Sequence, residues 1–116
     1  RYGLALGSVG DLVGSERVFR ELVLQDPENG HWHFHLGLLC SFQPRHAEAV
    51  ESFELAVALG DREAKTFYNL GVCYERIGSY GAAIAAFRQA IQIDPTWDES
   101  RRSLAGLFRR LGRNDE

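Results

Sequence analysis

The chain has 116 residues, of which 45% are apolar, and its formal net charge is −3. This length and composition fit one folded domain with its own core and exclude a disordered or collagen-like chain. The mild negative charge disfavours nonspecific nucleic-acid binding. We also expect a soluble segment with no membrane partner, because the sequence has neither an apolar run of about 20 residues nor a charged-then-apolar leader.

Phenylalanine recurs at a fixed interval, since Phe19, Phe53 and Phe87 are each 34 residues apart. Other residues follow the same interval, which is the signature of stacked repeats. These series are Gly3, Gly37 and Gly71; Ser15, Ala49 and Ala83; Leu22, Ala56 and Ala90; Leu36, Leu70 and Leu104; and the turn residues Gly10, Pro44, Gly78 and Gly112. The period therefore predicts units that each contain a turn at the same place.

Each unit is predicted to be a helical hairpin, because apolar residues recur at helical spacing before and after the turn at Gly78. Gly71 and Ala83 are small at the positions where the two helices must approach closely, and Phe87 is expected to fill the space beside them. Asp-Pro at residues 94–95 closes the unit, since proline does not continue a helix.

The segment FYNLGVCYERIGSYGAAIAAFRQAIQIDP, residues 67–95, resembles a tetratricopeptide repeat over its full length. This resemblance implies an all-α fold, a right-handed superhelical stack of antiparallel helical hairpins with about three repeats and a C-terminal capping helix. It covers nearly the whole chain, which we expect to form a single domain over residues 1–116.

Four segments follow from the resemblance in chain order. Residues 1–29 resemble the end of a first helix and a complete second helix, so this repeat is truncated. Residues 30–63 resemble a looser repeat, with His33 where the family prefers an aromatic residue. Residues 64–97 form the best-matching repeat, and residues 98–113 resemble a capping helix. Gly7 and Gly14 have no place in the repeat and predict a less stable first hairpin, at a cost of about 1 kcal/mol each.

Cys40 and Cys73 are the only cysteines, and both fall in apolar helical patterns. We expect small buried side chains rather than a disulfide, which favours a reducing compartment and a cytoplasmic location. The sequence contains no methionine. We therefore expect a processed chain or part of a longer protein.

His31, His33 and His35 form a local cluster in which His31 and His35 are one helical turn apart, a usable spacing for two metal ligands. No third ligand is evident nearby, so ordinary groove and surface histidines are favoured, with no metal and no cofactor. The glycine-rich start lacks the spacing of a phosphate-binding loop, no nucleophile motif occurs, and the carboxylates are expected on outward helix faces. The chain is predicted not to be an enzyme, and a metal-dependent reaction through His31 and His35 ranks third among the hypotheses.

In the family that the chain resembles, the first helix of each hairpin lines a concave groove. Apolar residues on that face are not needed for repeat packing and are expected to mark an exposed interaction surface, whose floor Leu4 would extend. Tyr68, predicted to lie between Phe34 and Arg102, is expected to anchor a partner with a ring that folding does not require. The predicted binding residues are Phe34, His35, Leu38, Lys65, Tyr68, Asn69, Val72, Arg76, Arg102 and Arg109.

The last predicted helix is basic, with five arginines against two carboxylates between residues 98 and 113. Arginines near a helix C-terminus offset the helix dipole, which is the favoured reading, but they could also hold an anionic ligand. An acidic peptide fits this helix better than nucleic acid, because exposed aromatics are not interleaved with the charges and residues 1–63 are acidic.

Some tetratricopeptide proteins hold acidic chaperone tails with a clamp of lysines, asparagines and an arginine. This chain departs from that pattern, since it has Phe34, Leu38, Glu99 and Ser103 at clamp positions and only Asn69 matches. We expect no strong binding of a chaperone tail.

The leading hypothesis is therefore a protein-interaction module that binds a peptide or partner helix in its groove. The alternative is an architectural spacer or a self-association unit that stacks through the truncated N-terminal hairpin.

Overall fold

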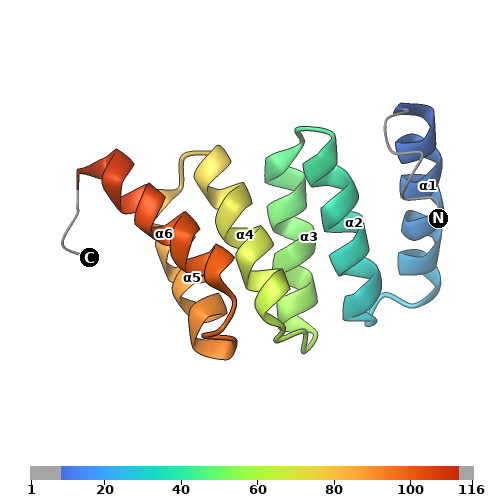
Figure 1. Ribbon diagram of the computed structural model, residues 1–116. Coiled ribbons are helices and arrows are strands. Elements are labelled where there is room, and N and C mark those ends of the chain that lie inside the picture. Colours follow the sequence, from blue (N-terminus) through green and yellow to red (C-terminus); the bar gives the residue numbers. More distant parts are fainter. Residues whose placement is uncertain (1–8, 113–116) are drawn as a thin grey trace. The chain divides into compact units, whose positions relative to one another are not determined.

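The structure is a computed structural model that describes residues 9–112. This part of the chain forms α-helices and no strand, which confirms the predicted all-α class (Figure 1). The chain divides into two compact units between Asp61 and Arg62. The helices are α1 (Val9–Gln25), α2 (Gly30–Phe42) and α3 (His46–Ala58) in the first unit, and α4 (Ala64–Arg76), α5 (Tyr80–Ile93) and α6 (Asp98–Leu111) in the second. Within residues 9–112, none of these helices is both long enough and apolar enough to cross a bilayer.

Each unit contains one antiparallel helical hairpin and one further helix. In the first unit α2 packs on α3 and α1 packs on α2, while in the second α4 packs on α5 and α6 packs on α5 (Figure 1). The predicted turns at Pro44 and Gly78 join the helices of the two hairpins. Gly78 has a φ of 86°, a left-handed conformation that glycine adopts without strain at the end of a helix.

The turn predicted at Gly10 is wrong. Gly10 lies inside α1, which begins at Val9 and runs for 17 residues, longer than any other helix of residues 9–112. A glycine permits a turn but does not require one, and its cost within a helix is only about 1 kcal/mol. The predicted end of a preceding helix, with Gly3 and Gly7, lies outside the described residues.

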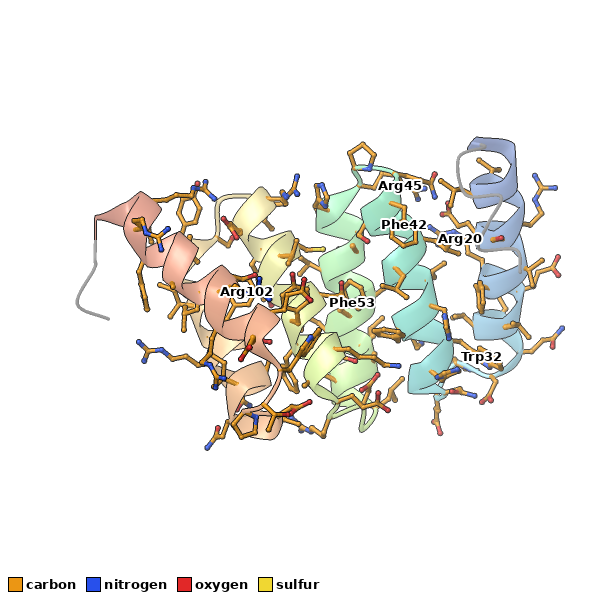
Figure 2. The ribbon with its side chains drawn as sticks, viewed as in Figure 1. Arg20, Trp32, Phe42, Arg45, Phe53 and Arg102 are labelled. Atoms are coloured by element: carbon orange, nitrogen blue, oxygen red, sulfur yellow. The ribbon has the colours of Figure 1, made fainter. Side chains whose placement is uncertain are left out.

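The predicted pairing of a glycine with a phenylalanine forms the centre of both hairpins. A Cβ atom added to Gly37 would lie 2.8 Å from the Phe53 ring, and one added to Gly71 would lie 2.7 Å from the Phe87 ring. Both rings are fully buried, and Figure 2 labels Phe53 in its hairpin. Only glycine allows this close contact, so the repeated glycines are explained by packing.

A buried carboxylate joins α1 to the turn between α2 and α3. The Glu16 side chain is 11% exposed and accepts hydrogen bonds from Arg45 Nη1 at 2.7 Å and from Arg20 Nη2 at 2.7 Å. Figure 2 labels the two arginines. Gln43 donates a further hydrogen bond at 3.3 Å. The expectation that the carboxylates lie on outward faces is therefore wrong for Glu16, because Arg20 of its own helix and Arg45 of the turn between α2 and α3 enclose it.

This cluster changes the protonation of its members. The hydrogen bonds from Arg45 are the largest cause that lowers the pKa of Glu16, to about 2, against the opposing effect of burial. Arg45 also donates to Glu48 at 2.6 Å and lowers the pKa of that carboxyl, while its own pKa is raised by the two carboxylates. Glu16 thus stays charged over the whole neutral and mildly acidic range.

Both cysteines are buried, each with 1% of its surface exposed, and neither forms a disulfide. This confirms the expected role of Cys40 and Cys73 as small core side chains. Burial raises the pKa of the Cys40 thiol, which makes it a poor nucleophile.

Candidate partner-binding groove

Helix α4 presents several predicted binding residues on one side, because three- and four-residue steps return to the same helix face. Tyr68, Val72 and Arg76 follow this spacing and line a pocket of about 570 Å³. The other residues that line it are Glu75, Tyr80, Ser103 and Arg110, which come from α4, the start of α5, and α6.

A second pocket of about 490 Å³ continues the first, since the two share Glu75, Ser103 and Arg110. It extends along α6 to Gly106, Leu107 and Arg109. We name the two pockets together the α4–α6 groove. The groove brings together four of the predicted binding residues: Tyr68, Val72, Arg76 and Arg109.

The groove is positively charged. Arg110 forms an ion pair with Glu75, whose side chain is 20% exposed, and its guanidinium lies 6.0 Å from the centre of the Tyr80 ring. Arg76 and Arg109 are exposed. Three arginines against one carboxylate leave an excess of positive charge beside the apolar surface of the groove, which attracts anionic groups.

Tyr68 lies in the wall of the groove, but its ring also belongs to the core. It contacts the rings of Phe87 and Trp97, at centroid distances of 5.9 and 5.0 Å, and packs against the buried cluster of α5 and α6. These contacts argue against the prediction that folding does not require this ring, because the ring packs on the buried Phe87 and on Trp97.

The remaining predicted residues of the second unit do not line the groove. The Asn69 side-chain amide donates to the Lys65 carbonyl at 2.8 Å, and Lys65 forms an ion pair with Glu63 at 3.4 Å. Arg102, labelled in Figure 2, is exposed on α6. Their role in binding stays a prediction.

The predicted residues of the first unit, Phe34, His35 and Leu38, lie on α2. Phe34 is only 4% exposed, and its ring lies 5.6 Å from that of Phe53. The expectation that Phe34 forms an exposed apolar surface is wrong, because the ring completes the core of the hairpin. His35 and Leu38 are half-buried, and Leu4 lies outside the described residues.

The three clustered histidines have different environments. His33 is buried, and its Nε2 lies 3.0 Å from the Pro27 carbonyl, so it is not the groove or surface histidine that was expected. The Nε2 atoms of His31 and His35 lie 3.1 Å apart. Among the described side chains, no group of three or more histidine, cysteine, aspartate or glutamate residues could hold a metal ion.

The sequence did not indicate that Tyr80 and Glu75 belong to the site. Tyr80 is a large aromatic residue that the 34-residue period does not explain, and this could have drawn attention to it. Glu75 and Arg110 are 35 residues apart, and no local sequence pattern predicts that they pair.

Two profiles of the tetratricopeptide repeat match the chain, one over residues 3–64 and one over residues 64–96. The chain belongs to the tetratricopeptide repeat family. This confirms the resemblance, and tetratricopeptide repeats are protein-interaction modules that in general do not catalyse reactions. A comparison with curated proteins found no match.

Solved tetratricopeptide structures share the fold. A crystal structure of MamA is 26% identical with a TM-score of 0.88, and the match covers 91% of this chain and 62% of that one. The first tetratricopeptide domain of Spaghetti (RPAP3), bound to the HSP90 peptide SRMEEVD, is 17% identical with a TM-score of 0.82, covering 89% of this chain and 84% of that one. A mutant O-GlcNAc transferase of Thermobaculum terrenum is 27% identical with a TM-score of 0.77, covering 85% of this chain and 19% of that one. The chain thus spans about three fifths of the length of the MamA chain.

Proposed function

We propose that the chain binds a segment of a partner protein in the α4–α6 groove, and that this segment carries acidic side chains beside an apolar one. The observation that carries the proposal is the lining of the groove, in which Tyr68 and Val72 adjoin Arg76 and Arg110. Apolar surface contributes affinity, and the surplus positive charge selects an acidic sequence and speeds its association.

The complex of the RPAP3 domain supports this proposal at the level of the fold. The peptide in that structure, SRMEEVD, contains three acidic side chains, so a tetratricopeptide domain can hold a short acidic segment. The present chain lacks most of the clamp residues named above. We therefore infer a different acidic sequence, recognised through the aromatic and arginine side chains of the groove.

The proposal can be tested with a panel of fluorescein-labelled peptides in which two aspartates flank a leucine or a phenylalanine, and with the same peptides carrying asparagine. Fluorescence anisotropy should show binding that requires the aspartates and weakens with salt. Arg76→Glu should lower the affinity by about tenfold, equivalent to about 1.4 kcal/mol.

Arg62→Glu is the matched control, because Arg62 is exposed and lies outside the groove lining. It makes the same charge change and should alter the affinity by less than about twofold. Equal losses in the two variants would show that the net charge alone attracts the peptides, and an unchanged Arg76→Glu variant would place the binding surface elsewhere.

We further propose that this module acts without catalysis and in the cytoplasm. Its groove is lined by arginines, tyrosines, a serine and a carboxylate already paired with Arg110, which suits recognition rather than chemistry. The two buried thiols are compatible with a reducing compartment.

The architectural alternative is favoured by one observation on α1. Val13 and Leu24 are 43% and 81% exposed, and they lie about three turns apart on the same side of the helix. A second chain could cover them. Sedimentation over a range of concentrations would then show dimers that Leu24→Glu dissociates, whereas a monomer at every concentration would exclude this function.

A further inference from the structure

His31 and His35 lie one turn apart on α2, and their Nε2 atoms are separated by 3.1 Å. The ring planes are nearly perpendicular, at 82°, with centroids 4.5 Å apart. In a linear N–H···N hydrogen bond, the ring centroids would lie farther apart than the nitrogens by about the width of an imidazole ring. The difference between the two separations here is smaller than that width. The two Nε2 atoms therefore form a bent hydrogen bond rather than a linear one, and an ion that displaces this hydrogen bond could approach both nitrogens from the side.

The separation of the nitrogens fits two bonds to one metal ion. Bonds of about 2.05 Å to nitrogens 3.1 Å apart enclose an angle of about 100°. This angle lies between the values of about 90° for square-planar or octahedral sites and about 109° for tetrahedral sites. A transition-metal ion could therefore bind both histidines with little movement of either ring.

Neighbouring aromatic rings hold the pair in place. The His35 ring stacks on Phe19 of α1 with centroids 5.1 Å apart and planes inclined by 15°. Trp32 packs beside His31 at 5.5 Å. His31 is exposed, so water can reach the pair. Contacts with rings that cannot coordinate a metal restrict the histidines before any ion binds, which lowers the entropic cost of binding.

We propose that His31 and His35 form a two-histidine site for a divalent transition-metal ion such as Ni²⁺ or Zn²⁺. Imidazole nitrogen is a preferred ligand of these ions, and binding through both Nε2 atoms replaces the hydrogen bond between them. No third histidine, cysteine, aspartate or glutamate completes a group of three within the described side chains, so water or a group from another molecule fills the remaining positions. The proposal reverses the sequence-based expectation of no metal, and it does not depend on the α4–α6 groove.

Calorimetric titration with Ni²⁺ tests the site directly. The wild-type chain should bind one ion, and His31→Gln and His35→Gln should each lower the affinity by about tenfold or more, since a single imidazole remains. His46→Gln is the control, because it removes a histidine of α3 that is not part of the pair, and it should bind like the wild type. The cysteines should not compete, because both are buried.

A second measurement separates metal binding from folding. Ni²⁺ should raise the melting temperature of the wild type progressively with concentration, and EDTA should reverse the rise. The melting temperature of His31→Gln should begin to rise only at Ni²⁺ concentrations about tenfold higher or more. Equal Ni²⁺ affinity in the wild type and both single variants would overturn the proposal, as would a melting temperature that rises equally in His31→Gln.

Discussion

Gly37 and Gly14 are both helical glycines of the first unit, but their surroundings are opposite. A Cβ atom on Gly37 would overlap the Phe53 ring at 2.8 Å, whereas one on Gly14 would meet no atom within 4 Å. Gly37→Ala should therefore destabilise the fold by about 1 to 3 kcal/mol through overpacking. Gly14→Ala should stabilise it by up to about 1 kcal/mol, because alanine favours the helix. Urea denaturation of the two variants would measure both changes, and changes of the same sign would contradict the packing described.

Phe87 is fully buried beside Gly71, so its ring contributes far more to stability than an exposed ring. Phe87→Ala should lower the free energy of unfolding by about 3 to 5 kcal/mol through lost burial and a cavity. Phe42, labelled in Figure 2, is 57% exposed and provides the control. Phe42→Ala should cost much less, and similar losses for the two variants in thermal unfolding would show that the repeat register is wrong.

Helix α1 is held to the turn between α2 and α3 by the charged cluster around Glu16. Because the pKa of Glu16 is lowered to about 2 in the folded chain, the unfolded chain binds more protons between that value and its ordinary value near 4.5. The stability from Glu16 is therefore complete above about pH 4.5 and is lost as the pH falls towards 2. Glu16→Gln should remove this part of the pH dependence. At neutral pH it should lower the free energy of unfolding by about 1 to 3 kcal/mol, a value between those for exposed and for buried ion pairs.

Urea midpoints between pH 2 and 7 would measure this effect. Glu21→Gln is the control, since Glu21 is an exposed carboxylate of the same helix, and its pH profile should follow the wild type. A Glu16→Gln variant with the wild-type slope between pH 2 and 4.5 would show that the cluster does not stabilise α1.

Tyr68 connects α4 with α5 and with Trp97, the residue before α6, so its ring affects the packing of three helices. Tyr68→Ala should lower the melting temperature. Thermal unfolding followed by helical circular dichroism would then show the loss of signal at a lower temperature than in the wild type. Tyr68→Phe should retain most of the stability, because it keeps the ring. Arg76→Ala removes an exposed groove side chain and should leave unfolding nearly unchanged, so a binding defect in that variant would report on recognition alone.

Recognition by the whole chain should differ from that of the RPAP3 domain. The one residue that matches a chaperone-tail clamp, Asn69, donates its side-chain amide to Lys65, and Phe34 is buried at a second clamp position. The peptide SRMEEVD should therefore show no micromolar binding in calorimetry. A dissociation constant below about 10 μM would contradict this and would indicate that Asn69 and Lys65 rearrange on binding.

Periodicity was sufficient to predict the family, the all-α class, the hairpin turns at Pro44 and Gly78, and the contact of Gly71 with Phe87. These features depend on residues that recur in each repeat, so the sequence displays them several times. The handedness of the stack and its continuation between the two units stay predictions.

The burial of Phe34, the core contacts of Tyr68 and the enclosure of Glu16 required the tertiary structure. Helical spacing identifies which residues share a face, but the exposure of that face depends on side chains from other helices. Arg45 reaches Glu16 across 29 residues, and Arg110 reaches Glu75 across 35. The spacing of His31 and His35 was visible in the sequence, whereas the approach of their nitrogens depends on ring orientations set by packing, including the stacking of Phe19 on His35.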